Sequence, residues 1–316
     1  MNNKQNMLLI LIFVLMIVFC LQIYNTYISI YKVDNFSIPV NNNIDSHTFD
    51  IWMYWENKSQ TKKPIYLNIC YDTVLYHCSD KFNIHLLNEK SIYDYLPNLR
   101  SDLDKRLNIP QKADYIRYNL LYKYGGIWLD SDIIIMNSLE SLIQKLRQYD
   151  YVGAGCHYNN CKDNGYPYPA NWVMVSRSHT RFMKMCIDRC DYILDSIYRY
   201  DSSSMINYHI FGRDNLWNNI KILKLSNWDY YHYDSKCLER DSKYRKITNE
   251  RLLSNEQIDQ NCINNLLYIP IYNTAPGFPK WFIDMNYDDI IYGKMLISRL
   301  FRKSLNIKIN TDCYTL

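Results

Sequence analysis

Hydrophobic patterning divides the chain into segments of different character. An apolar run is uninterrupted from residue 7 to residue 21, and together with residues 22–24 it is long enough to cross about 30 Å of hydrocarbon as a helix. The next residues, 25–48, are polar, rich in asparagine and without periodicity, as is typical of a stem. From residue 49 onward, apolar runs alternate with turn signals, as in a globular domain. We therefore predict a short tail over 1–6, a membrane-spanning helix over 7–24, a stem over 25–48 and one domain over 49–316.

Within the domain, strand-like and helix-like patterns alternate. A buried strand over 50–55, a helix over 64–78 and a second strand over 82–87 predict a parallel α/β arrangement. The clearest helix covers 110–124, because apolar residues recur at helical spacing and Gly125 follows as a stop signal. Further strands are expected at 126–129, 151–155 and 171–175, and a helix at 178–200, while residues 133–136 are again apolar. The stretch 288–316 reads as a basic amphipathic segment with a solvated helix face, or alternatively as a membrane-surface helix.

The apolar run near the N-terminus predicts an uncleaved signal anchor. Its end offers no small residues that would suit a signal peptidase, so a removable leader is not favoured. The alternative is a buried core helix. Orientation is weakly specified because Lys4 and Lys32 are the nearest charges on the two sides. We expect a single-pass type II membrane protein with its domain outside the cytosol, in the lumen of the secretory pathway or at the surface.

Composition excludes several classes of site. The chain has 36 Lys and Arg against 32 Asp and Glu, a net charge of +4, without a long basic run, so nucleic acid is not an expected partner. It contains only 8 glycines, and neither G-x-G-x-x-G, G-x-x-x-x-G-K-[ST] nor G-x-S-x-G occurs. Ten cysteines occur without a C-x-x-C pair, so structural zinc is not expected. A bound nucleotide would need something other than a glycine-rich loop to hold its phosphates.

Two acids directly after a predicted strand are the strongest candidates for chemistry. Asp130 and Asp132 are two residues apart, so an extended chain presents both side chains on one side. Carboxylate oxygens of this kind suit Mg²⁺ or Mn²⁺. Upstream, Asp114 and Arg117 are three residues apart and share a face of the predicted helix. Alone, either pair could be an ordinary surface feature, a solvated loop in the first case and an ion pair in the second.

The order of these residues resembles a known group of enzymes. Residues 113–132 read Ala-Asp-x-x-Arg-Tyr-x-x-Leu-Tyr-x-Tyr-Gly-Gly-x-Trp-x-Asp-x-Asp, which resembles the DXD region of glycosyltransferase family 32 and is similar to that of the glucosylating clostridial toxins. The run Ile-Trp-Met-Tyr-Trp-Glu at 51–56 resembles the opening strand of the capsular polysaccharide synthesis branch of that group. The resemblance implies a GT-A type fold, a Rossmann-like mixed sheet flanked by helices, and a hexosyltransferase that uses a nucleotide-sugar.

The resemblance also implies roles at the nucleotide end of the donor. Asp114 and Arg117 would contact the ribose and base end of a UDP- or GDP-sugar. Trp55, or else Trp52, would stack on the base, while the other packs in the core; Trp128 is expected in the core.

At the metal end, the resemblance implies that Asp132 ligates Mn²⁺ or Mg²⁺ directly. Asp130 would touch the ribose or sugar and reach the metal through water, and Ser131 would lie against the donor. A further metal or phosphate contact would come from the C-terminal half, with His209, Asp214 and His232 as candidates. The expected reaction moves the sugar to a glycan or glycoconjugate acceptor with retention of configuration, as in polysaccharide biosynthesis.

Two other interpretations also fit parts of the sequence. A phosphotransferase of the haloacid dehalogenase type also ends a strand in D-x-D, but it would carry Thr or Val two residues after the second acid, where this chain has Ile134. A membrane-anchored glycan-binding protein without catalysis would explain the aromatic residues. It would not need Asp114, Arg117 and the acid pair together.

Overall fold

The computed structural model describes residues 16–18, 21–22, 49–57, 62–154, 170–200, 228–231, 245–258, 260–271, 273 and 278–308. The chain divides into two compact units, residues 1–46 and residues 47–316. In the first, the five described residues are helical. Across the described ranges, no helix is both long and apolar enough to cross a membrane, and most of the span predicted over 7–24 lies outside those ranges.

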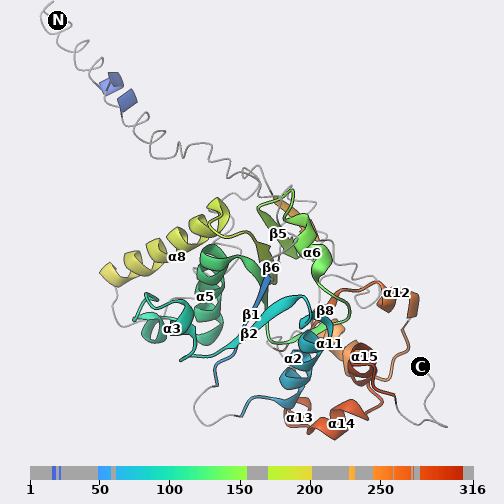
Figure 1. Cartoon of the computed structure of the whole chain (residues 1–316). Coiled ribbons are helices and arrows are strands. Elements are labelled where there is room, and N and C mark those ends of the chain that lie inside the picture. The colour runs from blue at the N-terminus through green and yellow to red at the C-terminus, as the bar shows by residue number, and fades with distance from the viewer. Residues whose placement is uncertain are drawn as a thin grey trace, which may run out of the picture. The chain divides into compact units, whose positions relative to one another are not determined.

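A six-stranded mixed sheet forms the centre of the second unit (Figure 1). Its strand order is β2-β1-β3-β6-β5-β7. The pairs β2/β1, β1/β3 and β5/β7 are parallel, whereas β6 is antiparallel to both β3 and β5. The strands are β1 Phe49–Tyr54, β2 Phe82–Leu87, β3 Gly126–Leu129, β5 Tyr151–Ala154, β6 Ala170–Ser176 and β7 Trp228–Tyr231. The expected α/β fold with a mixed sheet is confirmed, and the strands over 82–87 and 126–129 have the predicted bounds.

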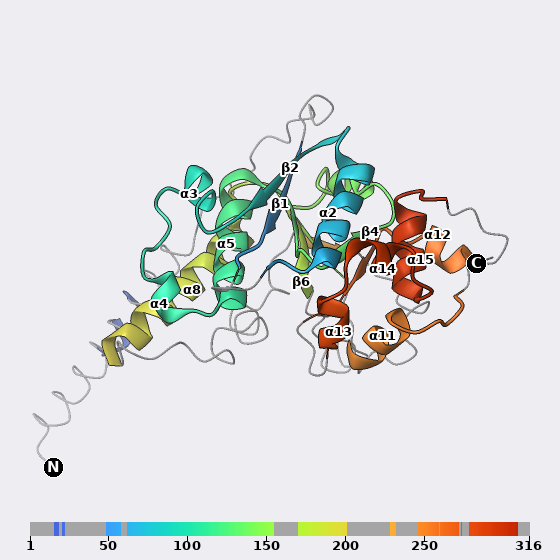
Figure 2. The ribbon, with the colours of Figure 1, turned by 90° about the horizontal axis from the view of Figure 1, so that it is seen from below.

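Helices cover both faces of this sheet. Alternate residues of a strand point to opposite faces, and Trp52 and Trp128 accordingly pack with α5 and α8, while Ile51 and Ile127 pack with α2 and α6. Figures 1 and 2 show α5 and α8 on the side of the sheet away from α2. The helices are α2 Ile65–Cys78, α3 Ile92–Tyr95, α4 Leu103–Arg106, α5 Ile109–Tyr124, α6 Glu140–Lys145 and α8 Arg181–Tyr200.

The C-terminal third packs beside α2 and adds a small second sheet. Strands β4 (Ile133–Ile135) and β8 (Tyr268–Pro270) pair antiparallel, so residues next to the acid pair meet a segment far along the chain. A third apolar cluster joins this sheet to α2 and to the C-terminal helices gathered around it in Figure 2. These are α11 Arg245–Leu252, α12 Gln260–Asn264, α13 Lys280–Ile283, α14 Tyr287–Ile291 and α15 Leu296–Ser304.

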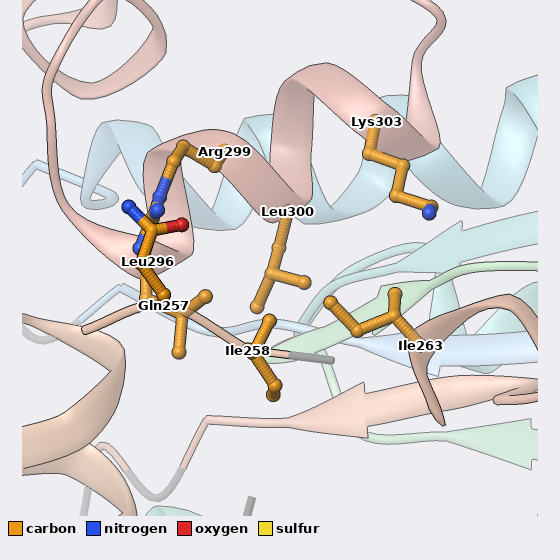
Figure 3. A pocket seen from close by; sticks show the side chains of 7 residues that line it. All are labelled: Gln257, Ile258, Ile263, Leu296, Arg299, Leu300 and Lys303. Carbon is orange, nitrogen blue, oxygen red and sulfur yellow. The ribbon is translucent and has the colours of Figure 1, made fainter. Parts of the chain in front are cut away.

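The amphipathic character expected near the C-terminus is found in α15, but one of its basic residues, Arg299, does not lie on a solvated face. Leu296, Leu300 and Phe301 are buried in the third cluster, and the neighbouring Arg299 is only 9% exposed. Burial lowers the pKa of Arg299, whose guanidinium donates to the backbone carbonyl of Glu256. A small hollow lies beside this helix (Figure 3). Its lining is Gln257, Ile258, Ile263, Leu296, Arg299, Leu300 and Lys303, which includes no carboxylate, hydroxyl or thiol.

Local signals at both ends of α5 place it against the sheet. Asn108 and Gln111 bond reciprocally, side chain to backbone amide, at 3.0 and 3.1 Å, a capping box that starts the helix. At the other end Gly125 and Gly126 have φ of +73° and +94°. A Cβ on Gly126 would lie 2.3 Å from the carbonyl oxygen of Asp50. Only glycine allows the chain to run so close to β1 between the helix and the next strand. This close approach positions β3 and the acids that follow it.

Candidate active site

The backbone of the acidic loop is attached to strands on both sides of it. The amide of Asp130 donates to a β6 carbonyl, that of Trp172, at 2.8 Å. The hydroxyl of Ser131 donates to the carbonyl of Tyr54, at the end of β1, at 3.0 Å. Two consecutive residues of the loop are therefore fixed by two different strands of the main sheet, which holds the loop still at the carboxyl end of β1 and β3.

Asp130 is oriented by a cation and an indole. The Arg117 guanidinium lies 3.2 Å from its Oδ1, and the Trp128 indole N–H donates to the same oxygen at 2.8 Å. Arg117 also lies over the Trp128 ring, 4.9 Å from its centroid. Burial raises the pKa of Asp130, and Arg117 and the indole bond act in the opposite direction. The carboxylate is thus held in one direction by groups that favour its charged form.

Arg117 links the first acid to the helix. Its guanidinium is also 3.2 Å from Asp114 Oδ1 and donates to the carbonyl of Asn171, whose side-chain amide donates to Asp114 at 2.9 Å. The prediction that Asp114 and Arg117 share one helix face is confirmed. Their side chains are only 10% and 5% exposed, and in the structure Arg117 holds Asp130. Contact with ribose or base stays a prediction.

Asp132 is half-buried and electrostatically unfavourable as an anion. Its pKa is raised to about 7, first by burial and then by repulsion from Asp130. The backbone carbonyl of Asp132 accepts from the amide of Ile271 at 2.8 Å, and the amide of Asn273 lies 3.5 Å from Oδ2. Two adjacent carboxylates that repel each other form an oxygen donor set that a divalent cation would neutralise, so these residues fit Mn²⁺ or Mg²⁺.

Further ligands for such a cation are not found in the part of the chain that the structure describes. Across those residues, no three His, Cys, Asp or Glu side chains gather as a metal-binding cluster. The candidates His209, Asp214 and His232 lie outside the described residues. Their role stays a prediction.

The two tryptophans at β1 have different environments. Trp52 is 1% exposed, donates through its indole N–H to the carbonyl of Gly125 at 2.8 Å, and stacks on His85 at 4.3 Å. A base cannot reach it, so the alternative in which Trp52 stacks on the nucleotide is wrong, and Trp52 is the core member of the pair. Trp55 lies just beyond β1, is partly buried, and its indole donates to Asn57 at 2.9 Å. Trp128 is in the core, as expected.

Three residues around the acids have no signal in the sequence pattern. The Trp128 indole bonds to Asp130, Asn171 to Asp114, and Asn273 approaches Asp132 from 141 residues further along the chain. Spacing rules apply only within one helix or strand. The contact of Trp128 depends on the direction of its side chain, and the contact of Asn171 depends on strand pairing. The contact of Asn273 depends on the pairing of β4 with β8. The sequence at 133–136 is a continuous apolar run, which does not identify the strand that it pairs with.

The solved structures that the chain resembles are named as glycosyltransferases, and both their sequence identity and their TM-scores are low. The galactosyltransferase LgtC in complex with donor and acceptor sugar analogs is 13% identical, with a TM-score of 0.42, over 83% of this chain and 98% of that chain. The glycosyltransferase GlyE of Streptococcus pneumoniae is 13% identical, with a TM-score of 0.40, over 82% of this chain and 64% of that chain. No curated protein matches the chain.

A family model described as capsular polysaccharide synthesis protein matches residues 19–232, which is more than half of the chain. The match covers the opening strand, α5 and the acidic loop. It confirms the resemblance seen in residues 51–56 and 113–132, and with it the class of enzyme, a glycosyltransferase. The chain therefore belongs to the capsular polysaccharide synthesis protein family.

Proposed function

We propose that this protein transfers a sugar from a nucleotide-sugar, a UDP- or GDP-sugar, to a glycan or glycoconjugate acceptor, and that the transfer depends on Mn²⁺ or Mg²⁺. The observation that carries the proposal is the pair Asp130 and Asp132, fixed at the carboxyl end of β3 and raised in pKa by burial. Ligands of open α/β sheets bind outside this end of the strands. The chain has no glycine-rich loop for the phosphates, so a cation held by carboxylates is the remaining economical way to neutralise a diphosphate.

Each acid has a separate task in this proposal. Asp132 would hold the cation directly, while Asp130, which contacts Arg117 and Trp128, would face the ribose or sugar and would contribute to the cation site through water. The bound cation supplies Lewis-acid stabilisation of the departing diphosphate. Retention of configuration follows if the acceptor attacks from the face that the diphosphate leaves, with a phosphate oxygen accepting its proton. No protein nucleophile is needed for that route.

Trp55 supplies the remaining donor contact. It is the partly buried tryptophan at the end of β1, next to the carbonyl that holds Ser131. An indole face at this position would stack on the base. The family match favours this function over the haloacid dehalogenase type and over a glycan-binding protein without catalysis.

Donor and metal should stabilise the folded protein together. With Mn²⁺ and a saturating nucleotide-sugar, near 100 times its dissociation constant, we expect about 2.7 kcal/mol of stabilisation. The melting temperature should therefore rise by several degrees in a thermal scan. Either component alone should raise it less. A screen of UDP- and GDP-sugars in the same assay would identify the donor, and the absence of any shift with metal present would overturn the proposal.

We also propose that residues 7–24 anchor the chain as a single-pass type II membrane protein, with the domain outside the cytosol. The support is the uninterrupted apolar run in the sequence. Full-length protein should stay with membranes after alkaline carbonate washing, whereas a chain that starts at residue 25 should be released. Release of both forms would contradict the anchor. In sealed microsomes, protease added from the cytosolic side should leave the domain intact, whereas protease added to the outside of spheroplasts should digest it.

A further inference from the structure

The second acid depends on a contact between two distant parts of the chain. Antiparallel pairing of β4 with β8 places the segment after β8 beside Asp132. Within this segment, the amide of Ile271 donates to the Asp132 carbonyl at 2.8 Å, and the amide of Asn273 lies 3.5 Å from the Asp132 carboxylate. The C-terminal third therefore contacts both the backbone and the carboxylate of this acid.

Asn273 is attached in turn to the first turn of α2. Its side-chain amide donates to the hydroxyl oxygen of Tyr66 at 3.2 Å. Tyr66 is 2% exposed, and its ring packs against Phe282 at 5.2 Å and Phe278 at 6.0 Å. With the ring fixed in this way, the hydroxyl has one direction. Burial, together with the charge of Asp132, raises the pKa of Tyr66, so the hydroxyl stays neutral at working pH.

We propose that Tyr66 and Asn273 form a latch that positions Asp132 for the divalent cation. The latch rests on the proposed metal-dependent transfer and adds to it two positioning residues outside the acidic motif. Without the Tyr66 hydroxyl, the Asn273 side chain would lose its hydrogen bond to α2. The Asn273 amide would then move relative to Asp132, and the carboxylate would sample more directions. Some residues hydrogen-bond to a metal ligand without touching the metal. Their removal typically lowers metal affinity by about 10- to 100-fold.

The test compares full-length wild-type protein with Tyr66→Phe, Asn273→Ala and the double variant. Tyr66→Phe keeps the ring and its packing, so the protein should fold. Tyr115→Phe is the matched control, because it removes another buried tyrosine hydroxyl, one that donates to Asp191 at 2.9 Å between α5 and α8. Free Mn²⁺ is measured by electron paramagnetic resonance, and hydrogen exchange of the Ile271 amide is measured without metal.

We expect each single variant to weaken Mn²⁺ binding by about tenfold and to speed exchange at Ile271. The double variant should weaken binding no further, because both changes break one contact and their effects should not add. Tyr115→Phe should match the wild type in both measurements. Unchanged exchange in both single variants, or faster exchange with an unchanged Mn²⁺ dissociation constant, would overturn the latch.

The same measurements separate the latch from the proposed function. If wild-type protein holds no Mn²⁺ at all, the proposed metal dependence fails. Exchange at Ile271 in the metal-free protein then decides on the latch alone: faster exchange in both single variants supports it, and wild-type exchange rules it out.

Discussion

Replacing Asp132 by asparagine should reduce metal-dependent hydrolysis of the nucleotide-sugar by about a thousandfold or more. The change keeps the size of the side chain and removes the charge that we assign to direct ligation. A metal acting as Lewis acid contributes several kcal/mol to the transition state, and each 1.36 kcal/mol is a factor of ten in rate. The measurement is the rate of donor hydrolysis at saturating Mn²⁺, detected by the release of the nucleoside diphosphate.

The Asp132→Asn protein should remain folded. The pKa of Asp132 is raised to about 7 in the folded chain, so above pH 7 its charge costs stability that a neutral side chain does not. In the absence of metal at pH 8, the melting temperature of the variant should equal or exceed that of the wild type. Asp188→Asn is the matched control, because this acid is exposed and paired with Lys184 on α8; its hydrolysis rate should be that of the wild type. Wild-type hydrolysis in Asp132→Asn would rule out the metal assignment.

Arg117→Met should destabilise the folded protein by about 3 to 5 kcal/mol, the usual cost of removing one partner of a buried ion pair. Methionine preserves most of the contact with the Trp128 ring but withdraws the cation from Asp114 and Asp130. Because Arg117 opposes the rise in the pKa of Asp130 that burial causes, that pKa should rise further in the variant. The deficit relative to wild type should therefore shrink as the pH falls and the carboxyl group takes up a proton.

Urea denaturation at pH 8 and pH 5.5 would measure both the deficit and its pH dependence. Lys184→Met serves as the control, since its ion pair with Asp188 joins two half-exposed side chains on one helix and should contribute less than about 1 kcal/mol at either pH. If Arg117→Met costs no more than Lys184→Met, Arg117 does not hold the acidic loop in the way the structure indicates. A large deficit that is the same at both pH values would show that packing, rather than charge, is lost.

The fold was predictable where local patterns decide it. The strand at 126–129 lies between a glycine pair and an acid, and the helix before it has an asparagine cap and a proline in its first turn, so both could be recognised from neighbouring residues alone. The parallel order of the first strands follows from their alternation with helices. The antiparallel insertion of β6 beside β3 does not, because strand direction depends on a long connection whose path the pattern does not encode.

The site was predictable for residues that carry their own motif and unpredictable for those that support them. Asp130, Asp132, Asp114 and Arg117 lie within twenty residues of one another, and two helical turns and a strand end bring them together. Trp52 and Trp55 are three residues apart at one strand end, and sequence alone could not say which is enclosed by α5 and His85. Asn273 and Tyr66 meet only because two strands and a helix from separate regions pack together.

Pairing of β4 with β8 bears on how short a working version of this chain can be. The family model ends at residue 232, before β8 begins at Tyr268. A chain that ended there would keep the acid pair, α5 and the contact between Arg117 and Asp130. Asp132 would lose the contacts with the backbone amides of Ile271 and Asn273, and β4 would expose an unpaired edge. Minimal versions made for screening should therefore extend through α15, whose buried face closes the cluster around β4 and α2.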